Sequence, residues 1–212
     1  FDELSKDGSA VVAIVLASAL SGTYQSAVFA KEALPDRRIE VIDSKCASSL
    51  YGMIAILAQE MASEGKQVEE IVSAVNGMVD NAITVFSVDT LDYLARNGRI
   101  GKAQYFLGTL LNMKPVLALD KEGYVTSVER IRGKDKVIPR LVEIVKERAG
   151  EGEKVHLCIS HANSKTESEK LKRFVQENLD VERLFETEIG SVIGAHAGPG
   201  TLGLFAIRSK AI

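Results

Sequence analysis

The residues Val11-Val-Ala-Ile-Val-Leu-Ala17 form a continuous apolar run, and Ser18-Ala-Leu-Ser-Gly-Thr-Tyr-Gln-Ser26 follows it directly. The first stretch is rich in β-branched residues and is typical of a strand buried on both faces of a sheet. In the second stretch, Ser21-Gly22-Thr23 predicts a turn that opens a helix, which ends near Leu34 because Pro35 cannot continue it. A buried strand that leads directly into a helix is the unit from which parallel α/β folds are built.

The chain that follows this unit continues the alternation of strands and helices. A second short buried strand is predicted over residues 39–42. Two helices with apolar residues three and four positions apart are predicted over residues 48–64 and 68–79. We therefore predict a parallel-sheet α/β domain over residues 1–80.

Beyond residue 80 the pattern changes to strands separated by turns and short helices. The predicted strands cover residues 83–88, 115–120, 124–132, 154–160, 183–187 and 202–208, and the predicted helices cover residues 90–97, 102–111, 137–145, 166–178 and 189–195. Between two of these strands, Lys121-Glu122-Gly123 predicts a hairpin. We expect an α+β domain with a mostly antiparallel sheet over residues 81–212, and no low-complexity linker separates it from the first domain.

Composition and charge exclude several classes of protein. The 212 residues carry a formal net charge of -3, which provides no basic surface for nucleic acid. No apolar run reaches the roughly 18 to 20 residues that a membrane-spanning helix needs, so we expect no stable membrane insertion. The two cysteines, Cys46 and Cys158, are too few for a disulfide framework, which favours a reducing compartment and a cytoplasmic location.

The turn at Ser21-Gly22-Thr23 is the first candidate binding site. It follows the carboxyl end of a buried strand, where parallel α/β folds bind ligands, and the free N–H groups of the next helix favour an anion. The hydroxyls of Ser21 and Thr23 add donors, and Gly22 allows a ligand to approach the backbone. The alternative is that Ser21 only caps the helix.

A second candidate is Ile189-Gly-Ser-Val-Ile-Gly-Ala-His-Ala-Gly-Pro-Gly-Thr201. Its glycines predict a turn whose backbone approaches a ligand closely, and His196 can donate a hydrogen bond to a carboxylate. The alternative is a histidine with a purely structural role. His156 and His161 flank a predicted strand and are interpreted as structural, and no spacing of His, Cys, Asp and Glu indicates a metal site.

Basic residues stand beside glycines in the segment Tyr93-Leu-Ala-Arg-Asn-Gly-Arg-Ile-Gly-Lys102, namely Arg96, Arg99 and Lys102. Such a loop is suited to contact phosphate or an acidic partner, but the solvated end of a basic helix has the same pattern. Arg130 and Arg132 lie two positions apart on one predicted strand, face the same side, and allow the same two interpretations. The dinucleotide, P-loop and nucleophile-elbow motifs are absent from the sequence, so nucleophilic catalysis has little support.

Five segments resemble, in this order, motifs of the DegV family: Leu20-Ser-Gly-Thr-Tyr-Gln-Ser-Ala27, Val41-Ile-Asp-Ser44, Leu91 to Ile100 with its Asn-Gly-Arg-Ile, Leu110-Leu-Asn-Met-Lys-Pro115, and Gly194-Ala-His-Ala-Gly-Pro-Gly-Thr201. The resemblance extends across nearly the whole chain. It implies a two-domain α/β protein that buries a fatty acid between its domains and is not an enzyme. Some family members deliver the fatty acid to a separate kinase, which phosphorylates the carboxylate to an acyl phosphate for phospholipid synthesis.

The resemblance also implies roles for individual residues. The residues expected at the carboxylate of a long-chain fatty acid belong to the two glycine-marked motifs and are Ser21 and His196, with Gly22 and Thr23 as further candidates. The residues expected in the polar network or on the kinase-facing surface are Arg99 and one of Arg130 and Arg132. No catalytic residue, metal or cofactor is expected.

The sequence departs from the family at its start. Family members usually carry a further strand–helix segment there, with a Thr-Ser-x-Pro-Ser-like loop that supplies another hydroxyl to the carboxylate. Nothing before Ala10 matches this segment, so we expect the parallel domain to be incomplete. Two alternatives remain for the same turn: an enzyme that acts on a small phosphorylated or carboxylated metabolite, and a lipid-sensing module without a transfer role.

Overall fold

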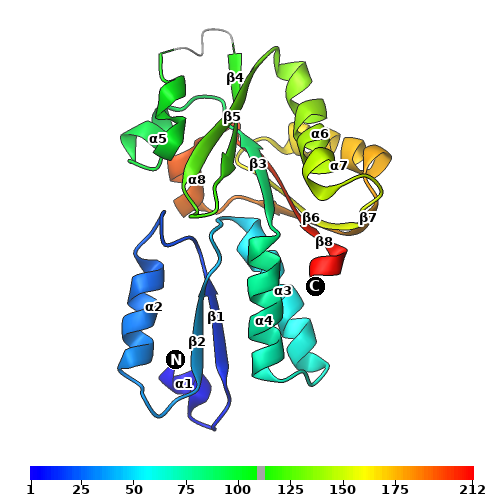
Figure 1. The fold of residues 1–212 in the computed structure, drawn as a ribbon. Coiled ribbons are helices and arrows are strands. Elements are labelled where there is room, and N and C mark those ends of the chain that lie inside the picture. Colours follow the sequence, from blue (N-terminus) through cyan, green and yellow to red (C-terminus); the bar gives the residue numbers. More distant parts are fainter. Residues whose placement is uncertain (109–112) are drawn as a thin grey trace.

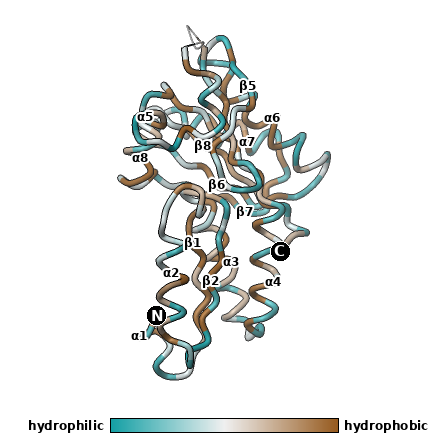
Figure 2. The backbone as a smooth tube through the Cα atoms, turned by 60° about the vertical axis from the view of Figure 1, so that its left-hand side comes forward, coloured by the Kyte–Doolittle hydropathy of each residue, from teal (hydrophilic) through white to brown (hydrophobic). Residues whose placement is uncertain are grey.

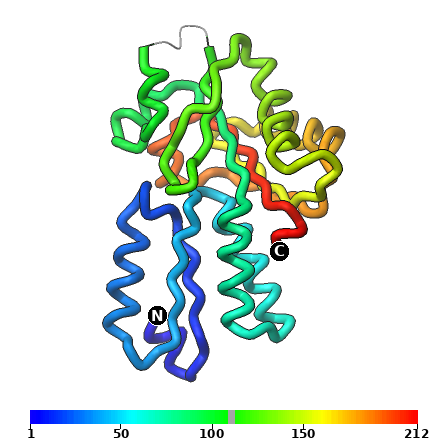
Figure 3. The backbone as a smooth tube through the Cα atoms, viewed as in Figure 1, coloured from blue at the N-terminus to red at the C-terminus, as the bar shows by residue number. Residues whose placement is uncertain are grey.

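Two sheets organise the protein in the computed structural model, which describes residues 1–108 and 113–212 (Figure 1). The first lobe contains α1 (Asp2–Ser5), β1 (Val11–Val15), α2 (Thr23–Glu32), β2 (Ile39–Asp43), α3 (Ser49–Ser63) and α4 (Val68–Asp80). The second lobe contains β3 (Ile83–Ser87), α5 (Asp92–Arg96), the 3-10 helix η1 (Gly101–Phe106), β4 (Met113–Leu119), β5 (Val125–Arg132), the 3-10 helix η2 (Lys134–Lys136), α6 (Val137–Ala149), β6 (Val155–His161), α7 (Lys165–Asn178), β7 (Val181–Glu188), α8 (Ser191–Ala197), β8 (Leu202–Arg208) and the 3-10 helix η3 (Ser209–Ala211). Figure 3 shows the two lobes one above the other.

The first lobe is built on a parallel pair of strands, as predicted. Val11 of β1 pairs with Ile39 of β2, and Val15 pairs with Asp43. Figure 2 shows these hydrophobic strands between α2 and α3. The prediction that β1 is buried on both faces is wrong, because all five of its residues are only partly buried. Among the described residues, β2 is the strand that pairs with β1.

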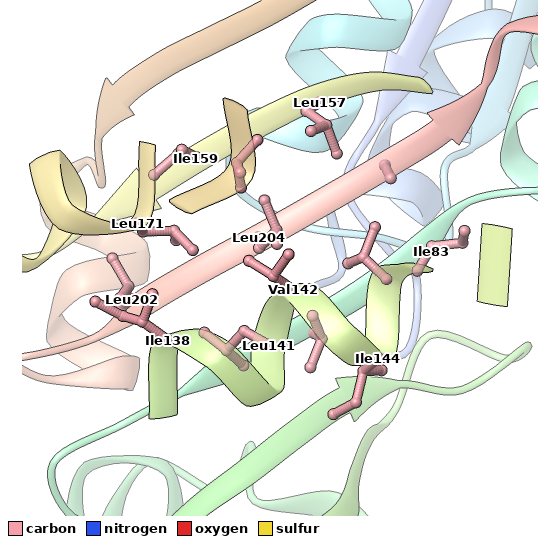
Figure 4. Packing of buried hydrophobic residues seen from close by; sticks show 14 of the residues in the cluster. Ile83, Ile138, Leu141, Val142, Ile144, Leu157, Ile159, Leu171, Leu202 and Leu204 are labelled. Carbon is pink, nitrogen blue, oxygen red and sulfur yellow. The ribbon is translucent and has the colours of Figure 1, made fainter. Parts of the chain in front are cut away.

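The second lobe contains a six-stranded sheet in the order β5-β4-β3-β8-β6-β7. All neighbouring strands are antiparallel except β6 and β7, which confirms the predicted mostly antiparallel sheet. Helices α6 and α7 cover one face of this sheet. There Val142 of α6 and Leu171 of α7 pack with Leu204 of β8 (Figure 4), and all three side chains are almost fully buried.

The opposite face of this sheet packs against helices of the first lobe. Side chains alternate along a strand, so Phe205 and Ile207 of β8 point away from α6 and join a hydrophobic cluster with Leu50 and Met53 of α3. The α4 helix contributes to the same cluster through Val75. The two lobes therefore share one apolar core, and this core fixes the surfaces that face each other at the candidate site.

The region after α5 differs from its prediction. A helix was expected over residues 102–111, but the structure has a short 3-10 helix over Gly101–Phe106, and residues 109–111 lie outside the described range. Gly101 has a φ of 52°, and a Cβ there would collide with the backbone of Val125. The close approach of this segment to β5 therefore determines its shape, which helical periodicity does not reveal.

Candidate functional site

A cavity of about 210 Å³ is lined by residues of both lobes. Its walls are mainly apolar, with Leu16 and Leu20 from the first lobe and Phe86, Leu119 and Phe205 from the second. The polar residues that line it are Ser21, Thr23, Ser48, Arg99, His196 and Thr201. A largely apolar cavity with a few polar groups is suited to an amphipathic ligand that is oriented by its polar end.

The turn that carries Ser21 is held by backbone hydrogen bonds beyond the end of β1. The Ala17 N–H donates to the carbonyl oxygen of Cys46 at 2.8 Å, and the Ser21 N–H donates to the carbonyl oxygen of Ala17 at 3.2 Å. The hydroxyl oxygens of Ser21 and Thr23 lie 2.9 Å apart, and the Thr23 N–H donates to Ser21 Oγ at 3.3 Å. The turn thus brings two hydroxyls together at the amino end of α2.

Gly22 is the N-cap residue of α2 and has no side chain with which to cap the helix. Ser21 is therefore not the N-cap residue itself, although its hydroxyl accepts the N–H of Thr23 at the first position of the helix. Gly22 has a φ of -69° and is absent from the described residues that line the cavity. Its position in the turn is as predicted, but its backbone conformation does not require a glycine.

His196 reaches the cavity from α8, which follows β7. Its Nδ1 atom is buried without a hydrogen-bond partner among the described residues. The glycines beyond this helix allow a close packing that larger residues would prevent: Gly198 has a φ of 82° and lies against the ring of Tyr93, and Gly200 lies against Asp89. The two glycine-marked motifs therefore contribute Ser21, Thr23 and His196 to one cavity.

The predicted arginines separate into two groups. Arg99 lines the cavity, and its Nε donates to the carbonyl oxygen of Leu20 at 3.1 Å. Arg130 and Arg132 are exposed on β5 and are not among the described lining residues. The guanidinium of Arg130 instead lies 5.2 Å from the centre of the Phe106 ring.

The remaining basic residues of the loop after α5 do not join the cavity either. Arg96 is exposed at the end of α5. Lys102 forms an ion pair of 2.6 Å with Asp120, and this hydrogen bond raises the pKa of Lys102. Of the basic cluster in residues 93–102, only Arg99 is therefore placed at the cavity among the described residues.

Two polar lining residues were missed by the sequence analysis. Ser48 precedes α3 with a φ of 62° and a ψ of -142°, a region that is costly for any residue except glycine. Thr201 is almost fully buried, and its hydroxyl donates to the carbonyl oxygen of Gly198 at 2.7 Å. The sequence signal that could have indicated Ser48 is its position at the start of a predicted helix. The signal for Thr201 is its place next to Gly200 in the glycine-rich motif.

The other histidines lie outside the lining of the cavity in the described residues. His156 and His161 are both buried on β6. The Ser164 N–H donates to His161 Nδ1 at 3.4 Å, and His156 Nε2 lies 3.7 Å from a carboxylate oxygen of Glu182. These contacts agree with a structural interpretation of both residues.

The thiols of Cys46 and Cys158 are free, and burial raises the pKa of each to about 12. Within residues 1–108 and 113–212, no group of three or more His, Cys, Asp and Glu side chains is arranged to hold a metal ion. In the same ranges, no helix combines the length and the apolar character that crossing a membrane requires.

The fold and the cavity define a two-lobed α/β protein with a mainly apolar cavity that carries a few polar groups. A family model described as "Uncharacterised protein, DegV family" matches residues 1–209. The chain belongs to the DegV family.

Relatives with similar sequences and structures agree with this assignment. A DegV domain-containing protein of Caldanaerobacter subterraneus subsp. tengcongensis is 34% identical over 205 residues, which cover 97% of this chain and 73% of the relative. A Thermus thermophilus structure, described as fatty acid binding of a DegV family protein, is 35% identical with a TM-score of 0.91 and covers 97% of this chain and 73% of that one. A Bacillus subtilis structure, described as DegV, a fatty acid binding protein, is 32% identical with a TM-score of 0.84 and covers 98% and 74%.

Proposed function

We propose that this protein binds a long-chain fatty acid, with its acyl tail in the cavity between the lobes and its carboxylate at Ser21, Thr23 and His196. The observation that carries the proposal is that these three side chains, which are far apart in the sequence, line one cavity whose other walls are mainly apolar. The fatty acids and lipids named for similar proteins have this combination of a long tail and one anionic end.

The two ends of such a ligand contribute differently to binding. A C16 tail has about 14 methylenes, each worth roughly 0.8 kcal/mol when it is buried. This gain exceeds the association and ordering costs of at least about 4 kcal/mol. A carboxylate left without partners in the cavity would be costly. We therefore assign the affinity mainly to the tail and the orientation of the ligand to the hydroxyls and His196.

We further propose that the protein is a carrier and that it presents the carboxylate to a separate fatty acid kinase. The support is that polar groups of the cavity lie at the surface: Thr23 and Arg99 both line the cavity and are exposed, and the neighbouring apolar lining residue Val192 is 70% exposed. Arg99 is the best-placed arginine for the polar network, and the exposed Arg130 and Arg132 are candidates for a partner-facing surface.

We propose that residues 1–80 and 81–212 form two domains, and the grouping of the elements into two lobes supports this division. The buried free thiols support a cytoplasmic location. Limited proteolysis tests the boundary, which we propose to lie in the short connection between α4 and β3. The alternative of a small polar metabolite at the same turn is less favoured because the cavity walls are mainly apolar.

The first experiment is mass spectrometry of an organic extract of the purified protein, combined with titration by palmitate. We expect bound fatty acid, and we expect Ser21→Ala combined with His196→Ala to lower its retention. Ser26→Ala, an exposed position on α2, is the matched control. A lipid-free protein that also fails to bind palmitate or oleate would contradict the proposal.

The carrier role is tested separately with palmitate-loaded protein, ATP and a fatty acid kinase. Acyl phosphate is trapped by hydroxylamine as the hydroxamate. We expect the hydroxamate only when both proteins are present. Hydroxamate formed without the kinase would instead support the enzyme alternative, and unchanged acid in the complete mixture would argue for a lipid sensor.

A further inference from the structure

The helix that carries His196 is weakly anchored by apolar packing. The α8 helix has seven residues, of which only Ala197 is buried, and Val192 on it is 70% exposed. Glycines stand at both of its ends, Gly190 and Gly198. Isolated helices of fewer than about 12 residues are unstable in water, so the position of α8 depends on its few contacts with the rest of the protein.

One of these contacts comes from the side chain of Asn97, directly after α5. Asn97 Nδ2 donates to the carbonyl oxygen of Ala195 at 3.1 Å. The same amide donates to the carbonyl oxygen of Tyr93 at 2.9 Å, within its own helix end. Both hydrogens of the amide are therefore used, one locally and one to reach α8. The accepting carbonyl belongs to the residue immediately before His196.

The Asn97 backbone is connected to the other half of the polar site. Arg99 Nη1 donates to the carbonyl oxygen of Asn97 at 2.8 Å, and Arg99 Nε donates to the carbonyl oxygen of Leu20 at 3.1 Å. Leu20 precedes Ser21 in the turn after β1. A continuous path of hydrogen bonds thus runs from the Ser21 turn through Arg99 and Asn97 to α8.

We propose that Asn97 is a positioning residue, whose amide holds α8 so that His196 faces the hydroxyls of Ser21 and Thr23. This inference rests on the proposed binding of the carboxylate at these side chains. Hydrogen bonds weaken steeply when donor and acceptor are misaligned, so a small shift of α8 is enough to lose the bond from His196 to the ligand. Asn97 itself does not line the cavity within the described residues.

The other contacts of α8 act at different points. The ring of Tyr93 packs on Gly198, and the Thr201 hydroxyl donates to the carbonyl oxygens of Ala197 and Gly198. These contacts hold the carboxyl end of the helix. When Asn97 is replaced, they keep α8 attached but leave the segment at Ala195 and His196 free to shift.

The test compares palmitate with 1-hexadecanol, which has the same tail but no carboxylate. We expect the wild-type protein to prefer the acid, and Asn97→Ala to reduce this preference by about threefold to tenfold, the value of one hydrogen bond. Asn97→Leu, which has a similar size but carries no donor and no charge, should have the same effect. Affinity for hexadecanol should remain unchanged in both variants, whereas a merely structural defect would lower both affinities together.

The chain offers a matched control in Asn178 at the end of α7. Its Nδ2 donates to the carbonyl oxygen of Phe174 at 2.7 Å, the same local bond that Asn97 makes with Tyr93. Asn178→Ala should leave the preference for the acid intact. A loss of preference equal to that of Asn97→Ala would overturn the inference.

A double-mutant comparison with His196→Ala separates the inference from the proposed function. If Asn97 acts through His196, adding Asn97→Ala to His196→Ala should cause no further loss of preference. An intact preference in His196→Ala would contradict the proposed carboxylate site itself. A reduced preference in His196→Ala together with a wild-type preference in Asn97→Ala would overturn only the positioning role.

Discussion

Arg99 Nε donates a hydrogen bond of 3.1 Å to the carbonyl oxygen of Leu20, and this bond joins the loop after α5 to the turn after β1. The two segments belong to different lobes, so the bond connects the lobes at the edge of the cavity. Arg99 also donates to Asn97, and no bond to another described residue is formed by its remaining N–H groups, which could contact a ligand or a partner. Arg99 therefore has a structural role in the site, whether its other N–H groups contact a ligand or a partner.

Arg99→Ala should weaken palmitate binding about tenfold, equivalent to about 1.4 kcal/mol, because the turn that presents Ser21 loses its connection to the second lobe. Titration calorimetry measures the change. Arg130→Ala is the control, since Arg130 is exposed on β5 outside the described cavity lining. Equal affinity of Arg99→Ala and the wild type would place the function of Arg99 at a partner surface instead.

Gly203→Ala tests how tightly the cavity wall at Gly203 and Phe205 is packed. A Cβ at Gly203 would lie 2.7 Å from the ring of Phe205, which lines the cavity beside it. The ring must move, and we expect a loss of about 1–3 kcal/mol in the free energy of unfolding, as for other overpacked cores. Affinity for palmitate should fall more than affinity for laurate. Urea unfolding and both titrations are the measurements, and an unchanged ratio of the two affinities would contradict the assignment of the tail to this region.

The local part of the site follows directly from the sequence. The strand, turn and helix around Ser21 are determined by neighbouring residues. The structure has β1 and α2 in the predicted order, with the turn between them. The partial burial of β1 cannot be predicted from neighbouring residues, because it depends on which strands pair with β1.

The assembly of the site depends on contacts that periodicity does not contain. Asn97 was part of a motif, but its bond to Ala195 joins segments that are remote in sequence. Ser48 has a positive φ directly before α3, which packs against the second sheet, and no local sequence pattern predicts this conformation. The sequence allowed the same two interpretations for Arg99 and Arg130. Only the folded structure shows that Arg99 lies at the cavity and Arg130 on the surface.

Ser48→Gly should stabilise the protein. Ser48 has a φ of 62° and a ψ of -142°, and its side chain makes no cap hydrogen bond to α3. Relief of about 1–3 kcal/mol of strain is partly offset by the greater freedom of glycine in the unfolded chain, about 0.5–1 kcal/mol, so a net gain of about 1 kcal/mol is expected. Ser26→Gly in α2 should lower the free energy of unfolding, which makes it a control of opposite sign. A loss of stability in Ser48→Gly would show that the Ser48 side chain contributes more than its backbone costs.

His156 should make the stability of the protein sensitive to mild acid. Burial lowers the pKa of His156 from its ordinary value of 6.5; Glu182 opposes this effect, and Arg183 adds to it. The unfolded chain therefore takes up this proton at a higher pH than the folded protein. The contribution of His156 to stability is present above pH 6.5 and is lost as the pH falls from 6.5 towards the lower folded pKa. We expect urea unfolding to show a steeper loss of stability between pH 7.5 and about 5.5 in the wild type than in His156→Gln, and parallel curves above pH 7.5. Identical slopes below pH 6.5 would mean that His156 titrates alike in the folded and unfolded chains.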